Sequence, residues 1–295
     1  MTARQTFDSV LTRFRAPHDR GPWRADLALG SGLTALAVEA ALRDVALLRG
    51  GGPVQVIGDP SMLARIGIDP RGGRVLGCSF STRSAEVLDG LAQLRARGQG
   101  CDLHGVGPDA DLPIPAQDVP HALRHLVFCA TVPLLLNSPL PSPIAAAPQV
   151  APFLHDVVLS GRLLLCIGDR DAFRIRLLLS YWLEYLRRPG FRLVFPDLTH
   201  DFLWADTRAT LAGAAFVLEP PPADLSDHRF RRLVDLLRGA GAPCLVLEPA
   251  PTPTPGSHVA QLIAITDDMF RLATACRCDL ETTLTFDNWN SPPSR

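Results

Sequence analysis

The stretch Arg74–Leu91, with the sequence RVLGCSFSTRSAEVLDGL, constrains the fold of this chain more than any other. Its run Val75–Cys78 is apolar and has the length of a short buried strand. After a polar turn, apolar residues recur at the spacing of a helix with one buried face, at Ala85, Val87, Leu88, Leu91 and Leu94. The stretch therefore predicts a strand that leads through a turn into a helix.

The turn between that strand and that helix carries four hydroxyl side chains, which are Ser79, Ser81, Thr82 and Ser84. The first N–H groups of a helix have no partner within the helix, and the helix dipole adds partial positive charge there. Hydroxyl groups around such an end form a receptor for a phosphate group. An ordinary Ser/Thr N-cap with polar neighbours is the alternative interpretation.

Composition limits the classes of function. The chain has 295 residues, enough for two domains, and a net charge of −1 from interspersed Arg, Asp and Glu. Because there is no basic stripe and no acidic tail, we expect no nucleic-acid partner. The sequence contains no lysine, so every fixed cationic side chain is an arginine and a lysine Schiff base is excluded.

Neither a membrane segment nor a metal site is expected. The N-terminal residues are charged throughout, unlike a secretion signal, and the most apolar run, Leu126–Leu136, is too short to cross a bilayer. The seven cysteines have no paired spacing, and Cys276 and Cys278 have no histidine at zinc-ligand spacing beside them. We therefore expect a cytoplasmic protein with reduced thiols, no bound metal and no cofactor.

Strand and helix patterns alternate along both halves of the chain. Strands are predicted at residues 27–29, 54–57, 75–78, 102–106, 162–167, 191–195, 214–219 and 243–247. The helices between them include residues 120–136, 171–186, 227–238 and 259–275. This alternation indicates an α/β chain with parallel sheets flanked by helices.

A Pro/Ala-rich connector at 138–152 divides the chain into an N-terminal domain, 1–137, and a C-terminal domain, 153–295. The segments Val75–Val106 and Ala214–Leu247 both run through strand, turn, helix, Gly-x-Gly and strand. The second-half turn, Glu219–Asp224, offers acid and proline in place of hydroxyls and would repel phosphate. We therefore expect one anion site per chain.

A second glycine motif, Gly30-Ser31-Gly32-Leu33-Thr34-Ala35, follows the first predicted strand and precedes a helix. It fits the G-x-G-x-x-A pattern of dinucleotide-binding folds, in which Asp59, at the end of the next strand, would bind a ribose. A nicotinamide or flavin enzyme is therefore an alternative, although it gives no role to the hydroxyl turn.

Together the two turns resemble those of sugar isomerase (SIS) domains, which bind phosphosugars. The family's G-x-G-x-S/T-x-x-A turn is matched by Gly30, Gly32, Thr34 and Ala37, and its S-x-S-G-x-T-x-E turn by Ser79, Ser81, Ser84 and Glu86. Thr82 stands where the family has glycine. The resemblance implies two flavodoxin-like SIS halves and a phosphate site formed by Gly30, Ser31, Gly32, Thr34, Ser79, Ser81, Thr82 and Ser84.

The second half resembles the bifunctional phosphoglucose/phosphomannose isomerases. Their N-E-N-A-K-x-P-A-F, P-E-L-N-H-N and closing Y-L-A…D-P segments are similar to Leu183–Phe191, Pro196–Asp201, and Met269–Ala273 with Asp279. This resemblance implies that Glu184 moves a proton between C1 and C2 of the sugar through an enediolate, and that His200 opens the ring. A solvated helix position for Glu184 and a capping turn at His200 are the alternatives.

The family also places an arginine after a proline to stabilise the enediolate. The matching segment here is Pro120-His121-Ala122-Leu123-Arg124, in which His121 replaces a fixed charge by a titratable one. Arg124 lies three residues on, on the same helical face, and could reach back. Both residues join Glu184 and His200 as candidate catalytic residues.

Histidines elsewhere receive structural interpretations. His121 and His125, four residues apart on one helix, could hold a metal, but core or surface roles are favoured because no further ligands lie nearby in sequence. We expect surface positions for His104, His155, His228 and His258.

The favoured function is the interconversion of fructose 6-phosphate with glucose 6-phosphate or mannose 6-phosphate. The alternative is a regulatory protein that binds a sugar phosphate and has lost catalysis, which the Thr82 and His121 departures favour. By resemblance we expect a homodimer whose subunits share sites, so that Glu184 and His200 could act from different chains.

Overall fold

The structure is a computed structural model, and it describes residues 2–17, 19–20, 22–65, 73–138, 150–168, 173–181, 185–186, 192–194, 213–220, 228–248 and 252–281. Most of the predicted connector and the candidate residues Glu184 and His200 lie outside these residues. The chain divides into two compact units, Met1–Ala146 with Pro253–Asp267 and Leu280–Arg295, and Ala147–Thr252 with Asp268–Asp279.

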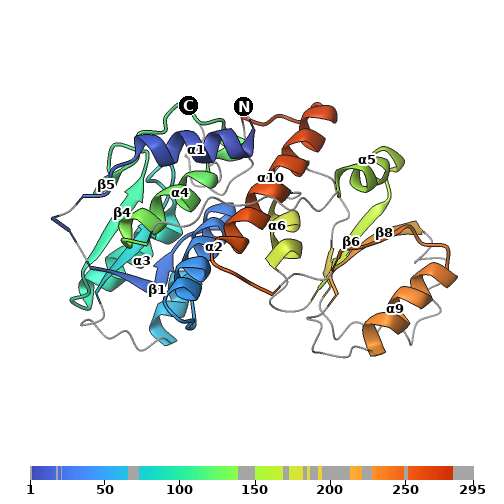
Figure 1. Cartoon of the computed structure of the whole chain (residues 1–295), viewed down its shortest axis with the longest axis horizontal. Coiled ribbons are helices and arrows are strands. Elements are labelled where there is room, and N and C mark those ends of the chain that lie inside the picture. Colours follow the sequence, from blue (N-terminus) through green and yellow to red (C-terminus); the bar gives the residue numbers. More distant parts are fainter. Residues whose placement is uncertain are drawn as a thin grey trace, which may run out of the picture. The chain divides into compact units, whose positions relative to one another are not determined.

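Unit 1 contains a sheet of five parallel strands in the order β2-β1-β3-β4-β5 (Figure 1). The strands are β1 (Trp23–Leu29), β2 (Gln55–Ile57), β3 (Arg74–Cys78), β4 (Cys101–Gly105) and β5 (Leu112–Pro113). This is the order of flavodoxin-like folds, in which the chain leaves the first strand on one side and returns to its other side. The carboxyl ends of β1 and β3 consequently lie next to each other.

Helices cover both faces of this sheet. They are α1 (Ala3–Arg13), α2 (Gly32–Leu48), α3 (Ala85–Ala96), α4 (Leu126–Leu135), the 3-10 helices η1 (Pro60–Arg65) and η3 (His121–Leu123), and the first part of α10 (Ser257–Ala275). On one face, Leu29, Val75 and Leu103 pack against Leu91 of α3 and Leu63 of η1. On the other face, α2 packs against α4, and α4 against α1.

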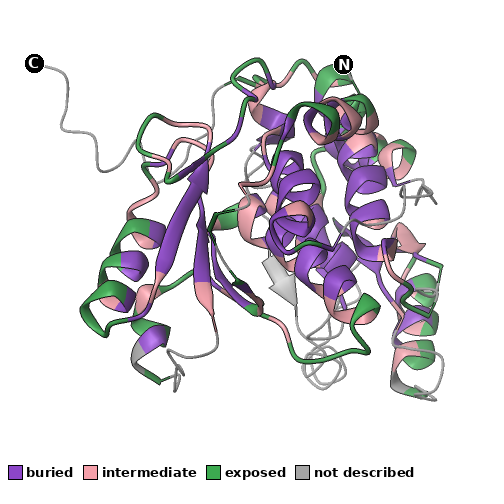
Figure 2. Ribbon diagram, turned by 60° about the vertical axis from the view of Figure 1, so that its left-hand side comes forward, coloured by how far each residue is buried: buried purple, intermediate pink, exposed green. Residues whose placement is uncertain are grey.

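Unit 2 repeats the arrangement with four parallel strands in the order β7-β6-β8-β9. Its elements are α5 (Ala151–Ser160), β6 (Leu163–Ile167), α6 (Phe173–Tyr181), β7 (Arg192–Val194), β8 (Ala214–Leu218), α9 (His228–Gly239), β9 (Cys244–Val246) and the end of α10. Leu233 and Leu237 of α9 pack on Phe216. In Figure 2 the buried residues gather on the strands and on the inner faces of the helices.

These elements confirm the predicted α/β class with parallel sheets flanked by helices. The sequence analysis did not predict β5, α5 or the 3-10 helix η1. The strand β5 has only two residues, and α5 begins inside the predicted connector, where Pro152 at the first helical turn was taken as a sign of loop. No helix in the described ranges is long and apolar enough to cross a membrane.

The surface positions expected for His104 and His258 are wrong. His104 is fully buried, with Nδ1 2.9 Å from the Leu112 carbonyl oxygen and Nε2 2.7 Å from Thr131 Oγ1. Nδ1 of the neutral ring donates to the carbonyl, and Nε2 accepts from the hydroxyl. His258 is buried against Asp44 of α2, whose carboxylate lies 2.8 Å from Nδ1. Partners distant in sequence account for both burials, and a single-chain pattern does not reveal them.

Candidate functional site

The hydroxyl turn that follows β3 is held by its own side chains. Ser79 is buried, and its Oγ lies 3.0 Å from Ser84 Oγ and accepts from the Ser84 N–H at 3.4 Å. The Arg83 N–H donates to Ser81 Oγ at 3.3 Å. The turn is therefore pre-organised, and two of its serines, Ser81 and Ser84, are only half-buried.

Thr82 adopts the left-handed backbone conformation, with φ of 59°. Its side chain is buried, and Oγ1 donates to the Ser81 carbonyl oxygen at 2.6 Å. Gly107, in the loop after β4, makes room for it, since a Cβ at Gly107 would lie 2.1 Å from Thr82 Oγ1. The backbone thus keeps the conformation that glycine provides in the SIS turn, although the residue is threonine.

The α3 helix begins directly after this turn without a side-chain cap. Ser84 is its N-cap residue but makes no capping hydrogen bond, because its hydroxyl is next to Ser79 instead. The dipole and the first N–H groups of α3 therefore remain available at the carboxyl end of β3.

The α2 helix begins in the same way at the carboxyl end of the adjacent strand β1. Its N-cap residue Ser31 makes no capping hydrogen bond, and Gly32 has φ of 53°. Gly30 lets the strand approach the helix, since a Cβ there would lie 3.1 Å from Ala35 Cα. Thr34 is half-buried in the first turn of α2. Two uncapped helix N-termini thus belong to adjacent strands, at the point where the strand order reverses.

At other helices of the described chain, a carboxylate accepts a hydrogen bond from an N–H group of the first turn. Asp267 accepts from the Ala3 N–H of α1 at 2.6 Å, and Asp44 accepts from the Val259 N–H of α10 at 2.9 Å. In unit 2, Asp268 accepts from the Ala151 N–H of α5 at 2.9 Å. The α4 helix continues from η3, so its first N–H groups bond to carbonyls of the preceding turn.

In unit 2 the corresponding edge of the sheet holds an internal anion. Glu219, directly after β8, accepts from Arg174 Nε at 2.6 Å and from the Ile175 N–H of α6 at 3.3 Å. Arg174 also donates to the Glu248 carbonyl oxygen at 2.7 Å, and both members of the ion pair are more than nine-tenths buried. A carboxylate of the chain therefore stands at the α6 N-terminus, where a bound phosphate would otherwise be placed.

The segment with the predicted cation lies between β5 and α4. His121 begins η3 and is half-buried, and Arg124 follows η3 directly. The guanidinium carbon of Arg124 lies 4.6 Å from the centre of the Phe80 ring, and Phe80 is the second residue of the hydroxyl turn. The structure therefore brings Arg124 to this turn, which the sequence left open.

His125 has a structural position. Its Nε2 lies 2.9 Å from Thr266 Oγ1, and burial lowers its pKa to about 3. Among the described residues no group of three His, Cys, Asp or Glu side chains gathers in a way that could hold a metal ion.

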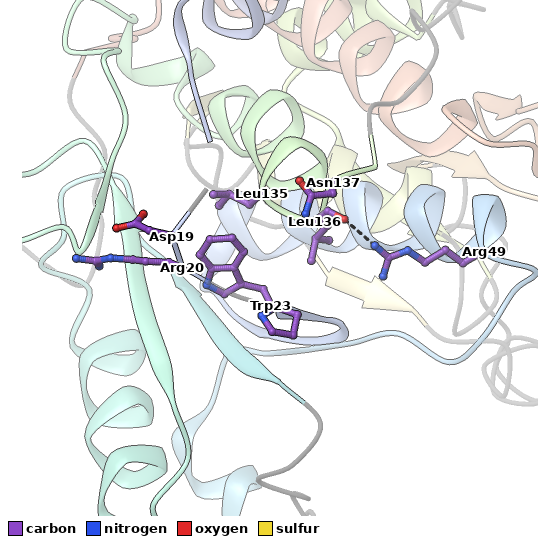
Figure 3. A pocket seen from close by; sticks show the side chains of 8 residues that line it. Asp19, Arg20, Trp23, Arg49, Leu135, Leu136 and Asn137 are labelled. Atoms are coloured by element: carbon purple, nitrogen blue, oxygen red, sulfur yellow. Dashed lines mark hydrogen bonds between the residues drawn. The ribbon is translucent and has the colours of Figure 1, made fainter. Parts of the chain in front are cut away.

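A hollow lies at the amino end of the unit 1 sheet, away from these turns. It has a volume of about 420 Å³ and is lined by residues that precede or begin β1 and by the last turns of α2 and α4, including Arg20, Trp23 and Arg49 (Figure 3). Arg49 donates to the Leu136 carbonyl oxygen and Arg20 to that of Asp111, while Asp19 adds negative charge. It lacks the uncapped helix N-termini of the carboxyl edge, so we do not assign the phosphate to it.

Strand order weighs against the dinucleotide alternative. In a dinucleotide-binding fold the third strand lies beside the second, giving the order 3-2-1-4-5. Here β3 lies beside β1, and Asp59 accepts hydrogen bonds from the Ser61 N–H and hydroxyl at 2.9 and 2.8 Å.

Sequence reasoning missed three residues of this edge, Phe80, Gly105 and Gly107. A Cβ at Gly105 would lie 2.0 Å from the Ser79 carbonyl oxygen, so both glycines are required for the loops after β3 and β4 to touch. The Gly-x-Gly pattern at the end of a predicted strand was a usable signal for them.

No family model matches this sequence, and no curated protein matches it. Solved structures share its fold. A glucosamine-6-phosphate deaminase from Thermotoga maritima superposes with a TM-score of 0.58 at 11% identity, covering 96% of this chain and 93% of that one. A protein assigned as a phosphosugar isomerase from Clostridium difficile 630 gives 0.58 at 13% identity, covering 98% and 93%.

A hypothetical protein from Thermus thermophilus gives a TM-score of 0.62 at 14% identity, covering 97% of this chain and 84% of that one. Likeness at such identities shows the fold alone: this chain has two flavodoxin-like subdomains, each with a parallel sheet flanked by helices.

Proposed function

We infer that the carboxyl edge of the unit 1 sheet binds the phosphate of a hexose 6-phosphate, through the turns Gly30–Thr34 and Ser79–Ser84. The observation that carries this proposal is the pair of adjacent helices, α2 and α3, that start without a side-chain cap. The starts of α1, α5, α6 and α10 each receive a carboxylate, so an external anion fits the uncapped starts of α2 and α3.

The proposed reaction is the interconversion of fructose 6-phosphate with glucose 6-phosphate, mannose 6-phosphate or both. Two of the structural neighbours, a glucosamine-6-phosphate deaminase and a protein assigned as a phosphosugar isomerase, support a phosphosugar as the ligand class. Glu184 would carry the proton between C1 and C2, and His200 would open the ring. Both roles rest on the sequence resemblance.

A coupled assay with the three sugar phosphates tests this function. We expect turnover by the wild type and a loss of at least a hundredfold in Glu184→Gln, since the amide cannot accept the C–H proton. Glu248→Gln, at an exposed residue of unit 2, is the matched control and should keep wild-type turnover. Absence of turnover with every sugar phosphate would exclude the isomerase.

The second candidate is a sugar-phosphate sensor without catalysis, which the threonine at position 82 and the histidine at position 121 favour. A sensor would show no turnover but a midpoint of thermal unfolding that rises with fructose 6-phosphate, because a ligand that binds only the folded state stabilises it. Turnover that Glu184→Gln abolishes would exclude the sensor.

A further inference from the structure

The proposed function leaves open which group stabilises negative charge on the oxygens of C1 and C2, because His121 stands where the SIS isomerases have arginine. We propose that Arg124 supplies this cation and that Phe80, in the phosphate-binding turn itself, is the residue that positions it. The inference rests on the proposed function, chooses Arg124 over His121 as the cation and adds one positioning residue, Phe80, to the same site.

Phe80 has a fixed backbone. Its carbonyl oxygen accepts two hydrogen bonds from the loop after β4, from the Val106 N–H at 2.9 Å and from the Gly107 N–H at 3.2 Å. The next residues are held by the hydroxyl turn, in which the Thr82 N–H donates to the Ser79 carbonyl oxygen at 3.2 Å. The ring is therefore carried by the same rigid turn that would hold the phosphate.

Arg124 has a fixed backbone as well. Its N–H donates to the His121 carbonyl oxygen at 3.2 Å, and its own carbonyl accepts from the Val127 N–H at 3.2 Å. Its guanidinium carbon lies 4.6 Å from the Phe80 ring centre, inside the range of a cation–π contact. This contact joins the segment before α4 to the turn after β3 through the two side chains.

The cation–π contact suits the chemistry that the site needs. A guanidinium carries its N–H groups in one plane, as a fork that can bind two neighbouring oxygens. Since the chain has no lysine, arginine is the only side chain here with a positive charge that does not titrate near neutrality. An enediolate presents two adjacent oxygens, which match that pair of donors.

The charge of a histidine would depend on pH and that of arginine would not. An ordinary imidazole loses its proton as the pH rises through about 6.5. If His121 supplied the cation, affinity for an enediolate mimic would fall between pH 6 and 8. With Arg124 in that role, the affinity shows no such fall and follows only the second ionisation of the probe's own phosphate at about pH 6.

The experiment measures the binding of two probes by calorimetry, a five-carbon aldonate 5-phosphate, whose carboxylate mimics the enediolate, and inorganic phosphate. Phe80→Leu keeps an apolar side chain but removes the ring face, and Arg124→Lys keeps the charge but removes the plane. We expect each variant to weaken the binding of the aldonate phosphate about tenfold or more. The binding of inorganic phosphate should weaken less than about threefold. Phe80→Tyr, which keeps the ring face, should bind both probes like the wild type.

His121→Gln distinguishes the two candidate cations. It should bind the aldonate phosphate within about threefold of the wild type, with the same dependence on pH from 6 to 8 as the wild type. A large loss in this variant, or unchanged affinity in both Phe80→Leu and Arg124→Lys, would overturn the inference. Thermal unfolding checks that each variant is folded. If Phe80→Leu does not fold, Arg124→Lys still tests the inference.

The phosphate site and the role of the Phe80–Arg124 pair are tested separately. If the wild type binds neither probe nor fructose 6-phosphate, the proposed function is wrong and this inference falls with it. If the wild type binds all three and the Phe80 and Arg124 variants behave like it, the phosphate site stands and only the role of this pair is wrong.

Discussion

Among individual residues, Thr82 has the backbone least suited to its side chain. A β-branched residue in the left-handed region costs about 1–2 kcal/mol relative to glycine, and Thr82 has φ of 59°. Its buried hydrogen bond to the Ser81 carbonyl and the space left by Gly107 offset this cost. Backbone strain of this kind persists where several surrounding contacts hold the conformation, as they do in this turn.

Ser81 offers a direct test of where the phosphate binds. Ser81→Asp places a negative charge in the turn, and like charges about 4 Å apart repel by about 4 kcal/mol at the dielectric of a partly buried site. Calorimetry should therefore show at least a hundredfold weaker binding of fructose 6-phosphate. Ser81→Asn introduces a side chain of the same size as aspartate but without charge, and it should weaken the binding of fructose 6-phosphate about tenfold or less. Equal affinities of the two variants would contradict the proposed site.

The buried histidines predict how stability depends on pH. Burial lowers the pKa of His104 to about 4 and that of His125 to about 3. Histidines in the unfolded chain have the ordinary pKa of about 6.5. Between this pH and the lowered pKa values, the unfolded chain binds protons that the folded chain does not, so stability is lost as the pH falls. The free energy of unfolding should drop by about 1.4 kcal/mol per pH unit for each of the two.

Denaturant titrations between pH 6.5 and 5 measure this slope. His125→Gln should be less stable at pH 7 because the packing around Thr266 changes, and its slope should be shallower by about one proton. A slope identical to that of the wild type would show that His125 is protonated in the folded protein.

At the scale of elements, the loops after β3 and β4 pack closely against each other. A Cβ at Gly107 would lie 2.1 Å from Thr82 Oγ1 and 2.4 Å from the Ser81 carbonyl oxygen, so this contact depends on glycine. Since Gly107 does not have a positive φ, the requirement is one of space alone.

Gly107→Ala should therefore displace the hydroxyl turn. We expect a loss of about 1–3 kcal/mol in the free energy of unfolding from overpacking, together with weaker binding of fructose 6-phosphate. Gly239→Ala is the control, since a Cβ there meets no atom within 4 Å. Denaturant unfolding and calorimetry give both quantities, and a Gly107→Ala variant with wild-type affinity would disprove the coupling of the two loops.

At the scale of the whole molecule, we propose a homodimer with shared sites. Sedimentation should give about twice the mass of one 31.9 kDa chain. If the phosphate turn and Glu184 come from different subunits, mixing inactive Ser81→Asp and Glu184→Gln chains creates heterodimers with one intact site. Such mixtures should recover up to about a quarter of the wild-type activity. Recovery of none, from dimers that do exchange, would mean that each chain holds its own complete site.

The sequence alone determined the local units of this protein. Apolar runs and helical spacing predicted most of the strands and helices within a few residues, β5 and α5 excepted, because each pattern reflects burial of one face of one element. The hydroxyl turn and the glycine turn were also readable, since side-chain type and neighbouring elements are local properties.

Only the tertiary structure decided what depends on contacts between distant residues. The approach of Arg124 to Phe80, the burial of His104, the carboxylate of Asp44 at the start of α10 and the space that Gly107 leaves for Thr82 all join separate elements. Such contacts follow from the order and register of strands, because parallel pairing brings turns far apart in the chain to one edge. Hence the sequence predicted which kinds of side chain form the candidate site, but it did not predict how they are arranged in space.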